Sequence, residues 1–190
     1  MTQHLALFSL VLSLGLGLGC GSGVSSDEQA CCVYLGFDAS IDKAISLGFD
    51  GFNAASSANI PPQMTTGLTS GTLAVSGQVD QGASANKGMR LSEAMVNYSD
   101  DGKLIYDTAA SASPALTMQL KNIPNGTLDG TLAGAFAMTG ELAGSVVLSI
   151  TFSGTLQPGA GSKVERKPGS THIIGTATSG NGTYQVDVTR

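Results

Sequence analysis

Between Leu128 and Leu156 the chain alternates strictly between two kinds of residue. The even positions hold large apolar residues or glycine, whereas the odd positions are mostly Ala, Ser and Thr. Such a period of two over many residues predicts β-structure with one face buried. Because single strands rarely exceed about 10 residues, we expect a bend near residues 139–141. The segment is therefore predicted to form a long hairpin.

Other stretches after Thr65 share the period of two, and glycine-containing dipeptides separate them. Asp101-Gly102 predicts a turn that joins residues 95–98 to residues 104–106. Asn181-Gly182 suits a two-residue hairpin turn, which would pair Ser179 with Tyr184. In that hairpin His172 falls on the polar face. We expect about seven or eight strands in all.

Residues 27–62 carry helical signals instead. Ser25 and Glu28 have the spacing of a capping box. Asp38 marks a second helix start, and Gly48 is placed as a C-terminal stop. We expect one or two short helices between residues 27 and 58, with Pro61-Pro62 ending the region.

The sequence thus predicts an α+β protein that is mostly β. A short helical segment at 27–62 would precede an antiparallel β domain at 63–190, whose curved sheet forms a partial barrel or a sandwich. The helical segment would cover an open end or face. The net charge of −5 and the pI of about 4.7 argue against nucleic acid as a partner.

The first 26 residues contain no charged side chain, and Leu5–Leu18 is apolar or small throughout. This run is shorter than the roughly 20 residues that a membrane-spanning helix needs, but it has the length of a signal-peptide core. Leu18-Gly19-Cys20 follows it.

With Gly19 before Cys20, the segment resembles the precursors of bacterial lipoproteins, although Gly17 stands where that family usually has Leu. The resemblance implies a signal peptide at 1–19, cleavage after Gly19 and a lipid on Cys20. It also implies a tether at 20–26 and, with Gly21 after the cysteine, an outer-membrane location in a bacterial envelope. The alternative is ordinary signal cleavage that leaves Cys20 free or disulfide-bonded.

The remaining cysteines, Cys31 and Cys32, are adjacent. Adjacent cysteines join only through a strained ring, because the Cα atoms of a disulfide are usually about 5.5 Å apart. We interpret them as small buried or idle thiols, with vicinal or intermolecular pairing as the alternatives.

No residue pattern in the mature chain predicts catalysis. Ser40 and Lys43 match the Ser-x-x-Lys pattern of penicillin-interacting enzymes, but the other motifs of those enzymes are missing. His172 is the one histidine of the mature chain, and no nucleophile motif accompanies it. Asp100, Asp101 and Asp107 lack the spacing of a calcium loop, and Asp100-Asp101-Gly102 is interpreted as a turn.

Residues 157–170 form a loop with three basic side chains, those of Lys163, Arg166 and Lys167. Such a loop could touch an anionic lipid or glycan, but it is most simply a solvated loop.

Three functions remain open. The first is a lipid-anchored envelope protein with a structural or interaction role. The second is a carrier of an apolar ligand or lipid, because Gly130, Gly134, Gly144 and Gly154 could leave room on the concave face of the sheet. The third is an integral outer-membrane barrel. We expect no enzymatic activity, no cofactor and no metal.

Overall fold

The computed structural model describes residues 25–190. This part of the chain contains one α-helix, ten β-strands and a short 3-10 helix. Their bounds are α1 (Ser26–Ala54), β1 (Asn59–Thr66), β2 (Ser70–Val79), β3 (Lys87–Ser99), β4 (Leu104–Asp107), β5 (Ala115–Lys121), β6 (Thr127–Gly140), β7 (Gly144–Pro158), η1 (Ala160–Ser162), β8 (Val164–Arg166), β9 (His172–Ser179) and β10 (Gly182–Thr189).

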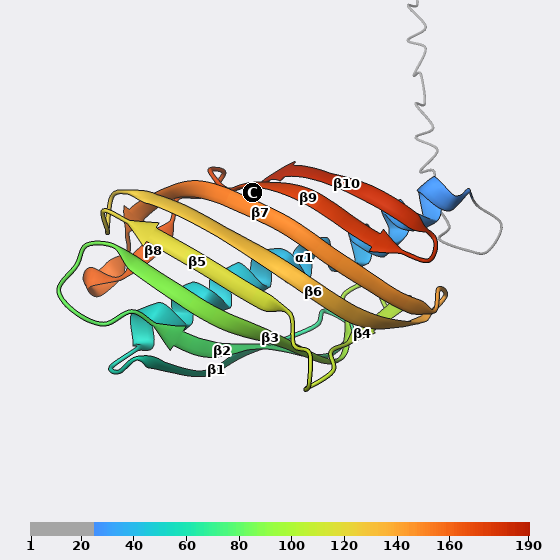
Figure 1. The fold of residues 1–190 in the computed structure, drawn as a ribbon, viewed down its shortest axis with the longest axis horizontal. Coiled ribbons are helices and arrows are strands. Elements are labelled where there is room, and N and C mark those ends of the chain that lie inside the picture. The colour runs from blue at the N-terminus through green and yellow to red at the C-terminus, as the bar shows by residue number, and fades with distance from the viewer. Residues whose placement is uncertain (1–24) are drawn as a thin grey trace, which may run out of the picture.

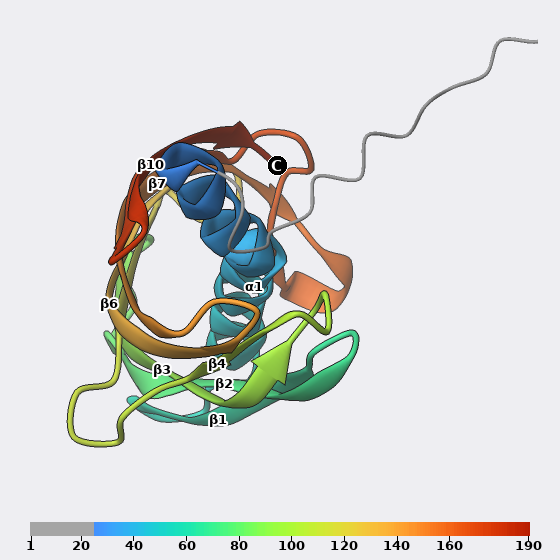
Figure 2. The ribbon, with the colours of Figure 1, turned by 90° about the vertical axis from the view of Figure 1, so that its right-hand side faces the viewer.

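The strands form one antiparallel sheet in the order β1-β2-β3-β4-β6-β7-β9-β10 (Figure 1). β5 also lies between β3 and β6, so β4 and β5 occupy one position in the sheet end to end. β8 pairs with β7 at residues 156–158. The sheet curls strongly about its long axis (Figure 2). The predicted partial barrel is therefore confirmed.

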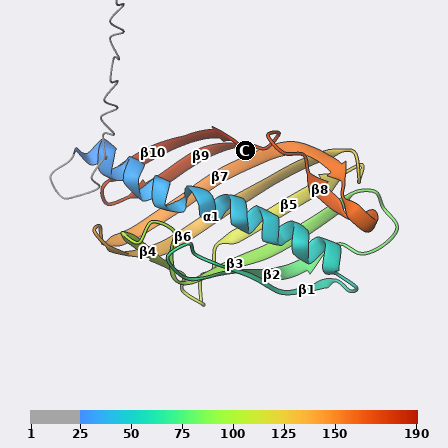
Figure 3. The same cartoon turned by 180° about the vertical axis from the view of Figure 1, so that it is seen from behind.

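Helix α1 lies along the concave side of the curled sheet (Figures 2 and 3). It packs against β1 and β2 on one side and against β9 and β10 on the other. Since β1 and β10 are the two ends of the strand order, the helix spans the opening between the sheet edges. The core lies between them, with aromatic contacts of Phe37 against Tyr106 and Phe136.

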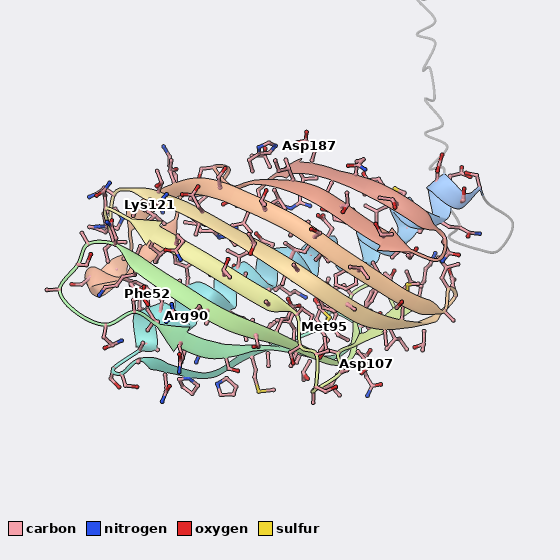
Figure 4. All side chains as sticks on the ribbon, viewed as in Figure 1. Phe52, Arg90, Met95, Asp107, Lys121 and Asp187 are labelled. Atoms are coloured by element: carbon pink, nitrogen blue, oxygen red, sulfur yellow. The ribbon has the colours of Figure 1, made fainter. Side chains whose placement is uncertain are left out.

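The opposite side of the sheet is convex and carries the polar positions. Figure 4 views the sheet from this side, with Arg90, Lys121 and Asp187 among the labelled residues. Leu148 is buried and Thr151 is exposed, as the alternation predicts. The apolar face of the sheet therefore turns toward the helix.

The two hairpins predicted with the most sequence support are present. β6 and β7 pair along their length, with Leu132 opposite Ile150, and the chain turns between Gly140 and Gly144. β3 and β4 pair through Tyr98 and Tyr106 around the turn at residues 100–103. Gly102 has φ of +73° there, a backbone conformation that suits glycine.

The register predicted for the last hairpin is wrong by two residues. Ser179 pairs with Gly182 rather than with Tyr184, so the turn residues are Gly180 and Asn181. Gly182, with φ of +129°, begins β10. A shift of two residues keeps every side chain on its predicted face. His172 is accordingly exposed, as expected.

The prediction of one or two short helices is also wrong, because α1 is a single helix of 29 residues that continues through its glycines. Gly36, Gly48 and Gly51 are all buried. A Cβ atom added to Gly36 would lie 2.5 Å from Tyr106 Oη, and one added to Gly51 would lie 2.5 Å from Ile60 Cγ2. These glycines permit close approach to the sheet and do not stop the helix.

The ends of the helix follow local rules. Glu28 N donates to Ser25 Oγ, and Ser25 N donates to Glu28 Oε2, so the predicted capping box is confirmed. The helix ends at Ala54, and β1 begins at Asn59, inside the range 27–62 assigned to the helical segment. Pro61 and Pro62 belong to this edge strand, where a missing N–H costs no ladder hydrogen bond.

Replacing Gly36 with alanine tests whether close packing fixes the helix. At an exposed helical site this change stabilises by about 1 kcal/mol. Here we expect a loss of about 1–3 kcal/mol, because the new methyl group overlaps Tyr106, whose hydroxyl donates to Val33 O at 2.9 Å. Denaturant unfolding measures the change.

Two controls accompany this measurement. Gly180→Ala should be close to neutral, because an added Cβ meets no atom within 4 Å there. Tyr106→Phe removes the overlapping oxygen, so the Gly36→Ala penalty should shrink in that background. A stabilising Gly36→Ala would show that this contact does not set the spacing.

Candidate functional site

A cleft of about 520 Å³ opens between the C-terminal half of α1 and the segment around β8. We call it the α1–β8 cleft. It lies within the size range of small-molecule sites. Its lining residues come from three places, namely the helix (Asp42, Ser46, Phe49, Asp50 and Asn53), the segment around β8 (Lys163, Glu165, Arg166, Lys167, Pro168 and Gly169) and the ends of the last two strands (Thr171 and Arg190).

The segment around β8 is fixed to the rest of the fold by specific hydrogen bonds. The side-chain amide of Asn53 forms two hydrogen bonds with the backbone of Val164. It donates to the carbonyl and accepts from the N–H, each at 2.9 Å. Lys167 N donates to Thr155 O at 2.9 Å, and Thr171 exchanges two backbone hydrogen bonds with Arg190. Hydrogen bonds to the helix and to neighbouring strands therefore fix this wall of the cleft.

Arg166 is the most constrained basic side chain of the cleft. Its guanidinium lies 2.8 Å from Asp42 Oδ1 and donates to Ser46 Oγ at 2.9 Å, and its side chain is only 16% exposed. Arg190 pairs with Asp38. Lys163 and Lys167 are exposed, and among the described residues neither ammonium group has a hydrogen-bond or ion-pair partner.

Thr171 adds an unusual polar atom to the cleft wall. The residue is 1% exposed, and Thr171 Oγ1 has no hydrogen-bond partner among the described residues. Leaving a buried hydroxyl unpaired costs free energy. The oxygen lies beside Gly154 of β7, at 3.2 Å from the position of a Cβ atom added there.

The sequence assigned residues 157–170 to solvent, and the structure corrects this in part. Val164–Arg166 forms a strand, and Arg166 is partly buried against the helix. The partners that order this segment, Asp42, Ser46 and Asn53, lie more than 100 residues earlier in the chain. No local sequence pattern in the loop predicts these contacts.

The other candidates from the sequence are dispersed. Gly19 and Cys20 lie outside the described residues. Cys31 is a free, half-buried thiol, so it forms no vicinal disulfide with Cys32. Cys32 is buried and disulfide-bonded, so its interpretation as a thiol is wrong.

The two residues of the Ser-x-x-Lys pattern have separate structural roles. Ser40 is buried and donates to Phe37 O at 2.7 Å. Lys43 instead joins the helix to the sheet, reaching Asp100 Oδ1 at 2.7 Å and Tyr98 Oη at 2.9 Å. Burial opposes ionisation of Asp100, but hydrogen bonds from Lys43, Tyr98 and Leu68 N hold its pKa below the usual value.

The remaining candidates have local roles. Asp101 Oδ1 accepts from the N–H groups of Lys103 and Leu104, so the interpretation of Asp100-Asp101-Gly102 as a turn is confirmed. Asp107 is the last residue of β4, and its Oδ1 accepts from Asn97 N. His172 Nε2 lies 2.7 Å from Asp187 Oδ1 on the convex face. Among residues 25–190, no group of His, Cys, Asp and Glu is arranged to hold a metal ion.

Glu93 is the feature that sequence reasoning missed. It is fully buried on the inward face of β3, opposite Val75 and between Leu91 and Met95 along the strand. Neither carboxyl oxygen has a hydrogen-bond partner in the described part of the chain. Burial raises its pKa to about 8, so Glu93 is mostly a neutral acid at pH 7. The sequence pattern that could have identified it is a charged residue at an alternate position of the strand, in the same series as Met89, Leu91 and Met95.

No protein-family model, curated protein or solved structure matches this chain. Among the residues that the structure describes, no helix has the length and apolar character needed to cross a membrane.

The buried Glu93 predicts an unusual dependence of stability on pH. Its pKa is raised from 4.5 in the unfolded chain to about 8 in the fold. The folded state thus binds the extra proton, and stability falls as pH rises between these values, by about 1.4 kcal/mol per pH unit at most. Denaturant unfolding between pH 5 and pH 8 should show this fall.

Glu93→Gln should remove most of the fall, because its amide does not titrate. The control is Glu141→Gln at an exposed position, which should leave the slope unchanged. A wild-type stability that stays constant from pH 5 to pH 8 would contradict the burial of an unpaired Glu93.

Proposed function

We propose that the protein is a lipid-anchored component of a bacterial envelope, located at the outer membrane, with a structural or interaction role rather than an enzymatic one. The membrane would be its first partner, through a lipid on Cys20 after cleavage at Gly19. A protein partner would then be recognised by the folded domain. The proposal has an anchoring part and a functional part, which depend on different observations.

The resemblance of Leu18-Gly19-Cys20 to a lipoprotein signal supports the anchoring part. The fold agrees with it, because the helix cap begins at Ser25, five residues after Cys20. An extended chain of that length spans at most about 17 Å. A lipid on Cys20 would therefore hold the N-terminal end of α1 close to the bilayer.

The filled interior is the single observation that carries the functional part. Helix α1 occupies the concave face, and its Phe37, Ile41 and Ile45 are each 1% exposed or less. Two of the four glycines that could have left room for a ligand are covered by neighbouring residues, whereas Gly144 is exposed and a Cβ atom added there would meet nothing within 4 Å. An added Cβ at Gly130 would meet the ring of Phe152, and one at Gly134 would lie 2.6 Å from Pro114. The packing supports a structural or interaction role over an apolar carrier.

Anchoring is tested by Cys20→Ser. The variant should move from the membrane fraction to the soluble fraction after cell breakage, because it lacks the acylated thiol. The wild type should incorporate a clickable fatty acid, whereas the variant should not. Cys31→Ser is the matched control, since Cys31 is a free thiol near the same end of the helix, and it should keep both the label and the membrane location.

The same experiment separates the two fates of Cys20. A thiol that carries an acyl group cannot also form a disulfide with Cys32. Intact mass measured without reductant reports which modification is present. An unlabelled protein with a disulfide at Cys20 would reject the anchoring part of the proposal.

The carrier alternative is tested by native mass spectrometry of the full chain carrying Cys20→Ser, purified without detergent. We expect the mass of the polypeptide alone, and no uptake of added fatty acid, because side chains fill the concave face. An additional mass from a bound apolar molecule would reject the structural interpretation in favour of a carrier.

A further inference from the structure

We propose that the α1–β8 cleft is a binding site for a small polar anion, a carboxylate- or phosphate-bearing molecule such as a sugar acid or a sugar phosphate. This inference goes beyond the anchored structural role. It holds whether or not Cys20 carries a lipid, because every residue that supports it lies between Asp42 and Arg190.

The distribution of charge is the first argument. The chain has nine Lys and Arg residues against fourteen Asp and Glu residues. Four of the nine basic residues line this cleft, namely Lys163, Arg166, Lys167 and Arg190. Only three acidic residues line it. With Asp38, the partner of Arg190, the carboxylates equal the basic groups in number, so the attraction of an anion depends on the lysines that have no ion-pair partner among the described residues.

Carboxylates pair with the two arginines of the cleft but not with its two lysines, and Asp38 is the partner of Arg190. Asp42 is paired with Arg166. Glu165 lies against the loop, where its Cγ would be 2.8 Å from a Cβ atom added at Gly159. Asp50 is exposed on the helix and could accept a hydrogen bond from a ligand hydroxyl group. This leaves the ammonium groups of Lys163 and Lys167 for an anion.

Preorganisation is the second argument. Asp42 and Ser46 hold the Arg166 guanidinium, which has five N–H donors, and these two contacts use only part of that capacity. Asn53 fixes the adjacent strand at Val164. A ligand would therefore meet an ordered wall rather than a mobile loop, and binding would cost less conformational entropy.

The position of the cleft suits an anchored protein. Asp42 lies sixteen residues along the helix from Ser26, which corresponds to about 24 Å. The cleft therefore opens well away from the end of the helix that follows Cys20. A molecule in the surrounding medium could reach it while the protein stays attached.

Isothermal titration calorimetry of the full chain, purified in a nonionic detergent, tests the proposal. The probes are glucuronate, glucose 6-phosphate and neutral glucose. We expect at least one of the two anions to bind with a Kd of about 1 mM or tighter, and glucose not to bind. Comparison of the two anions distinguishes a carboxylate ligand from a phosphate ligand. Added NaCl should weaken the binding.

Substitutions locate the binding. Lys163→Ala combined with Lys167→Ala should weaken it about tenfold or more, because two charge-assisted contacts are lost. These side chains have no partners in the fold, so the variant should unfold at the same denaturant concentration as the wild type. Arg90→Ala combined with Lys121→Ala is the matched control, since both residues lie on the convex face and pair with other residues. It should bind like the wild type.

Three results would overturn the proposal. The first is no heat of binding from either anion at about ten times the expected Kd. The second is equal binding of glucose. The third is an unchanged affinity in the Lys163 and Lys167 double variant, because binding would then occur elsewhere. None of these results affects the test of Cys20.

Discussion

The packing of α1 into the concave side of the sheet is the interaction on which the rest of the structure depends. The sheet curls but leaves β1 and β10 unpaired with each other, and the helix contacts the strands at both edges. A curled sheet alone would expose its apolar face, so the helix supplies the other half of the core. Buried glycines on the helix, such as Gly36 and Gly51, set how closely the two halves approach.

The same helix also builds the cleft from its other side. Asp42, Ser46, Asp50 and Asn53 follow one another at intervals of three or four residues, which places them along one stripe of a helix. Asp42 and Ser46 hold Arg166, and Asn53 holds Val164. The position of the cleft wall thus depends on the seating of the helix, because helix contacts orient the β8 segment. A change in the core beneath α1 would be transmitted to the cleft.

The parts of the fold that follow from local chemistry could be predicted from the sequence. Alternation over residues 128–156 gave the β6–β7 hairpin, and Ser25 with Glu28 gave the start of the helix. The predictions were wrong where contacts between residues far apart in the sequence determine the structure. Gly48 ends a helix by local rules, but here it faces Met118 across the core. The α1–β8 cleft could not be predicted for the same reason. Its basic loop contacts Asp42, Ser46 and Asn53, which lie far away in the sequence.

Stability alone does not account for the placement of the basic residues. Arg90 and Lys121 pair across strands with Asp80 and Asp129 on the exposed face, where such pairs contribute little to stability. Lys163 and Lys167 have no partner among the described residues, although eleven acidic residues lie outside the cleft lining. Two like charges held near a third, on Arg166, repel one another. The presence of Lys163 and Lys167 on one ordered wall is therefore better explained by the attraction of an anionic ligand than by a contribution to the stability of the fold.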